Sequence, residues 1–507
     1  MRVAYAPATN KGYYYVEEPR LSEEESSFYQ RLINRLTYTA KLVPGMGTDA
    51  YNPQTLEAMI VERARQISEE FVVGGLHELT REKLIYYVKR DLVGYGAINP
   101  LMDDPELEDI LVVGYDKPFI VMDRNWSDLD WLETNIQLVH DHQDQLARRL
   151  ALKGRSSVSV AFPIVTCMLP SHDRVAVTYR YEASPSGTSI SIRKFRKEPL
   201  TVPTLLDQPV FSPLMAAYLW TIIEDRGVIF VIGLPGSGKT VLCNALSLML
   251  RPQYHPVTIE DFPELSLPQE HKQSLTARYS RVLRGEAKRG EQIGDVTQVD
   301  LLRHALRIRP DFLIVGEILT QEAPVMFQAI NTGLGGSTSF HAADVHSAVT
   351  RLTEKTIGVD PAMLNMIDAV ILIQRLRHPV TGKIIRRVTS IDEIRGIGDY
   401  NNAFTYSPLA DVFSPSDPEV VVNKSVAMQK VATRRGISSG AMVEMLRDKV
   451  RFLEELQVRG IKNFADFSAA VKTYYAEQAR MLGGEEETSV SMEGERKKSA
   501  EDALLNL

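Results

Sequence analysis

The sequence has few cysteines, no long apolar run and no block of basic residues. Its 507 residues contain two cysteines, Cys167 and Cys243, which are far apart and form no C-x-x-C pair. This excludes a cysteine zinc site, and two buried thiols in a reducing compartment are a simpler interpretation than a disulfide. No apolar stretch approaches the roughly 18 residues of a membrane span, and residues 1–5 do not resemble a signal peptide. We therefore expect a cytoplasmic chain without a transmembrane segment, which reaches a membrane only through a partner.

The charge balance argues against direct nucleic-acid binding. The formal net charge is −7, and lysines and arginines are not clustered into the dense patch that phosphate neutralisation needs. Hydrophobic residues make up 44% of the chain and charged residues 24%, which are ordinary values for a globular protein. A chain of this length is too long for a single core, so roughly two to four domains are expected.

The most informative segment is residues 227–250. An apolar, β-branched run is followed by a turn that fits G-x-x-x-x-G-K-[ST] from Gly233 to Thr240, and then by a helical pattern. This motif binds phosphate when it lies between a strand and a helix. Backbone N–H groups would wrap a polyphosphate, Lys239 would reach the β- and γ-phosphates, and the Thr240 hydroxyl would ligate Mg²⁺. The alternative is a glycine-rich loop with no ligand. The predicted nucleotide-binding residues are Gly233, Leu234, Pro235, Gly236, Ser237, Gly238, Lys239, Thr240 and Asp261.

Two apolar runs end in carboxylates. Residues 312–316 precede Glu317, and residues 257–259 precede Glu260 and Asp261. Parallel strands present such ends beside a phosphate loop, where Glu317 could accept the proton of an attacking water. Glu260 could join Thr240 in holding Mg²⁺ or its waters, since Mg²⁺ prefers oxygen ligands. The alternative is that these acids end strands or cap turns.

A histidine and several arginines are further candidates. His341 follows a third strand-like run and could sense a γ-phosphate, although a lone histidine is more often structural. Arg193 and Arg196 lie in a short basic run, with Arg174 nearby in sequence. These three arginines either form a solvated face or stabilise the polyphosphate of a neighbouring subunit in the transition state.

Composition and periodicity divide the chain into five parts, and the alternation of strand and helix patterns in the third part predicts an α/β fold. Residues 278–295 within that part are charged and contain glycine, which predicts a mobile surface hairpin. The five parts are a helical region at 1–90, an α+β module at 91–200 that ends in a basic junction, a phosphate-loop domain at 201–395, a helical extension at 396–482 and a disordered tail at 483–507.

Four segments, in this order and spacing, resemble the secretion-superfamily ATPases, which are the motors of type II secretion, type IV pili and the archaellum. They are the phosphate loop at 233–240, an Asp box at 258–261, a Walker B strand at 306–317 and a His box at 335–342. Residues 89–102 resemble the N-domain signature of the archaeal branch, and residues 190–195 resemble its domain junction. The similarity spans residues 80–400.

The resemblance implies a RecA-like motor domain behind an N-terminal module, assembled as a homo-hexameric ring that uses ATP and Mg²⁺. The ring would act at the inner face of the cell membrane on a polytopic platform protein, and it would power the assembly or secretion of pilin-like filament subunits. By the same resemblance Glu317 is the general base, Glu260 a ligand of Mg²⁺ or its water, and His341 a sensor. Arginines near the junction, Arg174, Arg193 and Arg196 here, would complete the neighbour's site.

Two positions depart from the family's pattern. Relatives usually have an arginine where Leu319 stands, and they usually read Thr-Gly-His where this chain has Thr332-Gly333-Leu334. These departures leave a nucleotide-gated assembly scaffold with little hydrolysis as one alternative function. A RecA-like nucleic-acid translocase is the other alternative, and the acidic charge balance opposes it.

Overall fold

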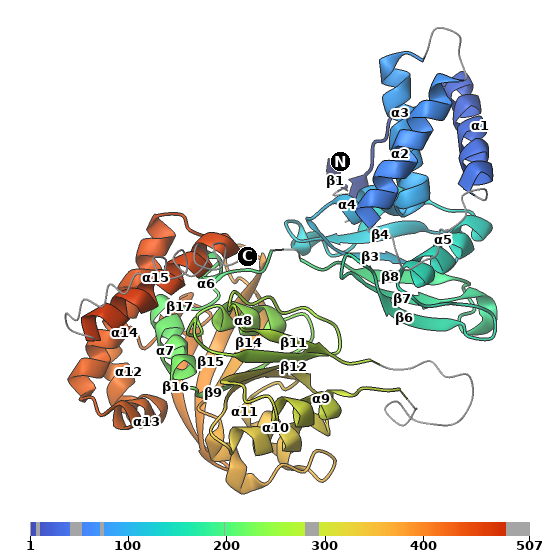
Figure 1. The fold of residues 1–507 in the computed structure, drawn as a ribbon. Coiled ribbons are helices and arrows are strands. Elements are labelled where there is room, and N and C mark those ends of the chain that lie inside the picture. The colour runs from blue at the N-terminus through green and yellow to red at the C-terminus, as the bar shows by residue number, and fades with distance from the viewer. Residues whose placement is uncertain are drawn as a thin grey trace, which may run out of the picture. The chain divides into compact units, whose positions relative to one another are not determined.

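The computed structural model describes residues 2–6, 11–40, 53–70, 76–196, 198–278 and 294–482. The chain forms two compact units, Met1–Lys197 and Glu198–Leu507 (Figure 1). Residues 279–293 of the predicted surface hairpin and the whole predicted tail at 483–507 lie outside the described residues. Among the described residues, no helix combines the length and the apolar character that a membrane crossing requires.

The first unit is built on an eight-stranded sheet in the order β1-β2-β5-β4-β3-β8-β7-β6. Neighbouring strands are antiparallel except for β2 and β5, which are parallel. Alternate side chains face the core, as period-two strands require, and helix α5 (His140–Lys153) packs Leu146 and Leu150 into it. The strands are β1 (Arg2–Ala6), β2 (Lys11–Tyr15), β3 (Leu107–Val112), β4 (Pro118–Asp123), β5 (Leu132–Gln137), β6 (Ile164–Met168), β7 (Arg174–Thr178) and β8 (Ser189–Arg193).

A separate layer of helices has its own small core. Helix α1 begins with a capping box, in which Ser22 and Glu25 exchange side-chain to backbone hydrogen bonds. Apolar residues at helical spacing, among them Leu32, Ile67 and Leu84, are buried between the helices. The helices are α1 (Glu23–Ala40), α2 (Pro53–Glu69) and α3 (Glu78–Val88), followed by η1 (Lys89–Val93), η2 (Gly96–Ile98) and α4 (Asn99–Asp103), with the short turns η3 (Ser127–Leu129) and η4 (Arg180–Glu182) further on.

The prediction that residues 1–90 are helical is wrong for residues 2–6 and 11–15. These residues form β1 and β2, which extend the sheet of the first unit. Tyrosine has a preference for strands, and in β2 Tyr14 is buried while Tyr13 and Tyr15 flank it on the opposite face. Pairing with β5, more than 110 residues away, fixes this strand, so local periodicity did not reveal it.

The second unit is built on a nine-stranded sheet in the order β11-β10-β12-β13-β9-β14-β15-β16-β17. The first six strands of that order are parallel, and the last three are antiparallel. The parallel strands β9, β10 and β13 are buried along their whole length, as is usual for sheets covered on both faces. The strands are β9 (Val228–Ile232), β10 (Pro256–Glu260), β11 (Gln273–Thr276), β12 (Phe312–Ile318), β13 (Gly335–Phe340), β14 (Ala369–Arg377), β15 (Ile384–Gly396), β16 (Asp399–Ser407) and β17 (Val412–Ser414).

Helices cover both faces of this sheet and bury two apolar clusters (Figure 1). One cluster contains residues of α7 and α8, and the other contains residues of α9, α10 and α11. This arrangement confirms the predicted α/β fold class. The helices are α6 (Val202–Asp207), α7 (Pro213–Glu224), α8 (Lys239–Ser247), α9 (Gln298–Ala305), α10 (Glu322–Ile330) and α11 (Val345–Thr353), with the 3₁₀ turn η5 (Pro361–Met366).

The prediction of a helical extension from residue 396 is wrong for residues 399–414, which form β16 and β17 and continue the sheet. Helices begin only at Pro418, and they are α12 (Pro418–Lys424), α13 (Val426–Arg435), α14 (Ser439–Val458) and α15 (Phe464–Leu482). They pack beside α6 and α7 (Figure 1). Trp220 of α7 donates a hydrogen bond to Tyr475 of α15, and the buried Lys449 of α14 pairs with Glu224 at 2.5 Å. The helices therefore share the core of the second unit.

Candidate active site

The glycine-rich loop between β9 and α8 has the backbone of a phosphate cradle. Gly236 and Gly238 have φ values of 74° and 99°, which side-chain-bearing residues rarely adopt. A Cβ at Gly233 would lie 2.3 Å from the carbonyl oxygen of Ile373, so no side chain fits there. Gly238 is the N-cap of α8, and the free N–H groups of the first helical turn therefore border the loop.

Polar groups inside this loop fit an anionic ligand. The Ser237 side chain is 1% exposed, and among the described residues its hydroxyl has no hydrogen-bond partner. Lys239 is also buried; its Nζ donates to the carbonyl oxygen of Leu234 at 3.3 Å and lies 3.1 Å from Nδ1 of His341. Burial lowers the pKa of Lys239, against the opposing effect of the Glu317 charge. A buried cation and an unsatisfied hydroxyl beside free N–H groups suit the phosphates of a nucleotide.

The sheet order brings the predicted catalytic residues to the same edge as the loop. Strand β13 lies next to β9, β12 follows it, and β10 follows β12. His341 directly follows β13, Glu317 lies near the end of β12, and Glu260 ends β10. The carboxyl ends of parallel strands meet at one edge, so the topology assembles these residues although they are far apart in sequence.

Lys239, His341 and Glu317 form a continuous polar chain. Nε2 of His341 lies 2.5 Å from Oε1 of Glu317, and Nδ1 of the same ring faces the Lys239 ammonium. Because an ammonium can only donate, Nδ1 accepts from Lys239, which leaves the ring proton of a neutral imidazole on Nε2, the nitrogen 2.5 Å from the carboxylate oxygen. The Glu317 side chain is 38% exposed, so it can both hold this contact and meet water.

Glu260 occupies a drier position than Glu317. It is 4% exposed, and its Oε1 accepts the backbone N–H groups of Glu264 at 2.9 Å and Leu265 at 3.0 Å. Burial raises its pKa to about 7, although these two hydrogen bonds act in the opposite direction. A Cβ at Gly316 would lie 3.2 Å from Cγ of Glu260, so this glycine lets β12 approach the carboxylate closely. Glu260 and the half-buried Thr240 supply the kind of oxygen ligands that Mg²⁺ prefers, and Asp261 follows at the end of β10, also half-buried.

Sequence reasoning missed Arg351 of α11, ten residues after His341. Its guanidinium donates to the carbonyl oxygen of His341 and lies 4.9 Å from the ring centroid of Phe340. These contacts hold the backbone at the residue that bears the imidazole. The contact is made to a main-chain atom, so no side-chain pattern in the sequence could have predicted it.

The three predicted arginines belong to the first unit. Arg174 begins β7 and Arg193 ends β8, and the register places them opposite each other. Arg193 is 67% exposed while its Nε lies 3.2 Å from Asp109, and Arg196 is also exposed. Lys194, between them, turns inward and donates to the carbonyl oxygens of Leu101 and Asp104, and burial lowers its pKa to about 8. The exposed basic face therefore consists of Arg174, Arg193 and Arg196, and Lys194 is not part of it.

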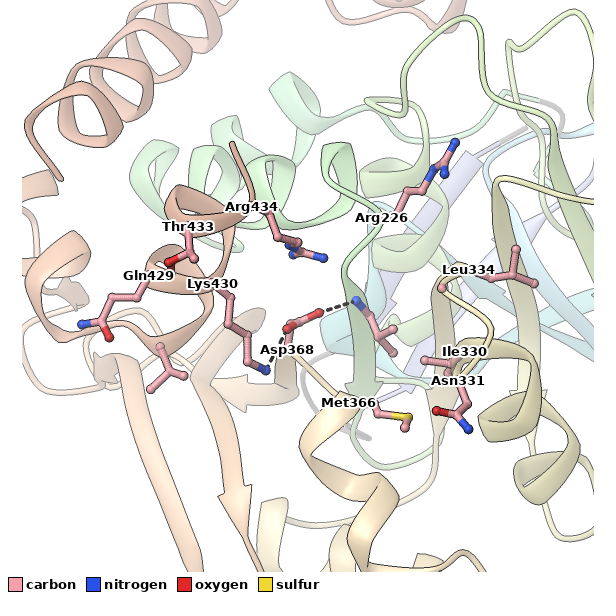
Figure 2. Close-up of a pocket in the computed structure, with 13 residues that line it drawn as sticks. Arg226, Ile330, Asn331, Leu334, Met366, Asp368, Gln429, Lys430, Thr433 and Arg434 are labelled. Carbon is pink, nitrogen blue, oxygen red and sulfur yellow. Dashed lines mark hydrogen bonds and ion pairs between the residues drawn. The ribbon is translucent and has the colours of Figure 1, made fainter. Parts of the chain in front are cut away.

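The two departures from the family's pattern lie at different edges of the sheet. Leu319, just past β12 and 50% exposed, stands two residues after Glu317. Leu334 precedes β13 at the amino edge and lines a cavity of about 680 Å³ together with Met366 and residues of α13 (Figure 2). Figure 2 shows Asp368 within that cavity, where it accepts hydrogen bonds from Val228 N–H and from the Lys430 ammonium. This cavity is separate from the phosphate loop.

Comparison with known proteins places the chain among secretion proteins. A family model described as type II/IV secretion system protein matches residues 94–401. The uncharacterized protein MJ0900 of Methanocaldococcus jannaschii is 33% identical over 91% of this chain and 79% of its own length. The type IV secretion system protein VirB11 of Bartonella quintana is 25% identical over 60% of this chain and 93% of its own length. Among solved structures, the chain is similar to the X-ray structure of the Legionella pneumophila ATPase DotB, with 16% identity over 68% of this chain and 84% of that chain and a TM-score of 0.41.

Proposed function

Because the chain belongs to the type II/IV secretion system protein family, we propose that it is an ATP hydrolase that powers the assembly or secretion of pilin-like filament subunits. The observation that carries this proposal is the chain of contacts from Lys239 through His341 to Glu317 at the edge of the phosphate loop. It joins a residue for binding phosphate to a residue for accepting a proton, which are the two functions that phosphoryl transfer to water requires.

The residues of the loop and of the neighbouring strands divide the chemistry between them. The loop N–H groups and Lys239 bind the β- and γ-phosphates of ATP. Glu317 orients a water molecule for in-line attack and accepts its proton. His341 holds the Glu317 carboxylate through Nε2 and, from the same ring, contacts the lysine beside the phosphates, so it can report whether that lysine has moved to a γ-phosphate.

Thr240 and Glu260 are the proposed ligands of Mg²⁺ or of its bound water, and Asp261 directly follows Glu260 in sequence. When bound, Mg²⁺ neutralises charge on the phosphate oxygens. The chain's own contribution is to hold two oxygen ligands on different elements, α8 and β10, at one edge of the sheet. The close approach of β12 at Gly316 keeps the Glu260 side chain in place.

We propose that the active form is a homo-hexamer in which Arg193, Arg196 and Arg174 of one subunit complete the nucleotide site of the next. The exposure of Arg193 and its cross-strand position opposite Arg174 support this role. The ring would work at the inner face of the cell membrane on a polytopic platform protein. A nucleotide-gated scaffold is the second candidate, which the exposed Leu319 in place of an arginine favours.

The substitution Glu317→Gln tests the proposed activity. Gln is nearly isosteric with Glu but cannot accept the proton, so the variant is expected to bind ATP as the wild type does while phosphate release falls by about two orders of magnitude or more. The matched control is Glu354→Gln, an exposed glutamate in the same unit. Wild-type protein that binds ATP but releases no phosphate would favour the scaffold, and equal turnover in Glu317→Gln and the wild type would show that the base is another residue.

A further inference from the structure

The β14–β15 hairpin extends past the end of β9 and lies against the phosphate loop. Strand β9 pairs with β14 only as far as Ile232 and Leu372, whereas β14 and β15 stay paired to Arg377 and Ile384. The carbonyl oxygen of Ile373, the first residue beyond this limit, lies against Gly233 so closely that a Cβ there would be 2.3 Å away. The projecting part of the hairpin is therefore a wall along one side of the loop.

One arginine on this wall faces the loop. A Cβ at Gly238 would lie 3.5 Å from Cδ of Arg386 and 3.9 Å from its Nε, and 3.7 Å from Cδ1 of Ile373. Residues paired across strands point to the same face, and Arg386 pairs with Arg375, two residues beyond Ile373. The Arg386 side chain therefore lies within van der Waals reach of Gly238, the N-cap of α8, where the backbone N–H groups of the cradle begin.

The surroundings of Arg386 differ from those of its neighbour in the chain. Arg387 is buried on the opposite face, and its Nε lies 3.0 Å from Asp411. Arg386 is half-buried, and among the hydrogen bonds and ion pairs of the described residues its guanidinium has no carboxylate partner. A half-buried positive charge without a counter-ion is costly, and an anionic ligand in the adjacent cradle would supply one.

The sheet order determines which part of a nucleotide Arg386 can meet. Glu317, Glu260 and His341 lie at the carboxyl ends of β12, β10 and β13, on the β13 side of β9, whereas the hairpin lies on the β14 side. A nucleotide whose γ-phosphate faces Glu317 must therefore extend its α-phosphate and nucleoside toward the hairpin. We propose that Arg386 binds the α-phosphate of the nucleotide and so forms a subsite beyond the glycine loop and Lys239. This inference rests on the proposed ATPase function and adds a ligand contact to it.

Binding of ADP and of the non-hydrolysable ATP analogue AMP-PNP, both with Mg²⁺, tests this subsite by calorimetric titration. Arg386→Met keeps an unbranched apolar side chain and removes the charge. A charge-assisted hydrogen bond to phosphate corresponds to roughly a 10- to 100-fold change in affinity. We expect Arg386→Met to weaken both ligands by the same factor, because both contain the α-phosphate, and Arg386→Lys to recover part of the loss.

The matched control is Arg395→Met, an exposed arginine nine positions along the same strand and about 30 Å away at 3.3 Å per residue. Its affinities should equal those of the wild type, and equal thermal unfolding midpoints would show that all variants are folded. An unchanged affinity in Arg386→Met, or a loss confined to AMP-PNP, would overturn the assignment, since the second result would place Arg386 at the γ-phosphate. With either of these two results, a loss of nucleotide binding in Lys239→Ala would still support the proposed ATPase function. Wild-type protein that binds neither ligand would overturn both proposals.

Discussion

Glu260 is expected to destabilise the folded protein at alkaline pH. Its pKa rises from an ordinary value of 4.5 to about 7 in the folded state, because burial disfavours the charged form. Between these two values the folded state retains a proton that the unfolded state has lost, so stability falls as pH rises through this window. Each pKa unit corresponds to about 1.4 kcal/mol, and the full penalty is therefore about 3 kcal/mol above pH 7.

The substitution Glu260→Gln should remove this penalty. Gln is neutral at every pH, and its carbonyl oxygen can still accept the N–H groups of Glu264 and Leu265. The variant should therefore be more stable than the wild type by about 3 kcal/mol at pH 8, whereas near pH 4.5 the two should be equal. For a unit of this size 1 kcal/mol shifts the unfolding midpoint by about 2 °C, so the expected increase at pH 8 is about 6 °C.

The assay is thermal unfolding of nucleotide-free protein in EDTA at several pH values between 4.5 and 8.5. Glu270→Gln is the matched control, because Glu270 is an exposed glutamate in the segment that follows β10. If Glu260→Gln is no more stable than the wild type at pH 8, or if the difference does not shrink toward pH 4.5, the reasoning about burial is refuted. The same variant should lose ATP turnover, since an amide is a poor ligand for Mg²⁺. Greater stability would then accompany loss of function, as is common at active sites.

Two further predictions concern the nucleotide and the ring. Lys239→Ala should abolish productive ATP binding, because it removes the charge aimed at the phosphates; a titration with labelled ATP that gives wild-type affinity would show that the loop is not the site. Specific ATPase activity should rise steeply with protein concentration, and Arg193→Ala should bind ATP but turn it over about 10³-fold or more slowly, as for the loss of an arginine finger. Mixing Arg193→Ala with Lys239→Ala should restore some phosphate release, since some interfaces in a mixed ring contain both an intact Arg193 and an intact Lys239. Light scattering would confirm that rings form. If no mixing ratio restores activity although rings are present, Arg193 has no role in trans.

Much of the central sheet could be predicted from the sequence. The apolar run before the phosphate loop lies in β9, the runs at 257–259 and 312–316 lie in β10 and β12, and the strand-like run before His341 is β13. Strand β15 was missed because it carries charged residues such as Arg386, Arg387 and Glu393 among its apolar ones. Pairing with β14 holds it in place, and such long-range pairing overrides local propensity. The family resemblance is confirmed by the family match.

The candidate site was predictable where local spacing defines it, and not where contacts across the sheet define it. The phosphate loop is a continuous motif, so its residues could be named in advance. The contact between Lys239 and His341 joins residues 102 positions apart, and only the β9–β13 pairing brings them together. Arg351 and Arg386 carry no motif, because one contacts a carbonyl oxygen and the other lies beside the backbone of Gly238. The catalytic roles of Glu317, Glu260 and His341 stay predictions.

The two departures from the family's pattern have unequal consequences for hydrolysis. Leu334 lies at the amino edge of the sheet, seven residues before His341, which is about 23 Å along an extended strand. A change there does not touch the phosphate loop directly. Leu319 stands two residues after Glu317, and its N–H and that of Thr320 donate to Oε2 of Glu322, which fixes the turn after β12. An arginine at this position would add a positive charge near Glu317, the proposed general base, and leucine does not. We therefore expect the choice between a fast motor and a slow, nucleotide-gated scaffold to depend on Leu319 more than on Leu334.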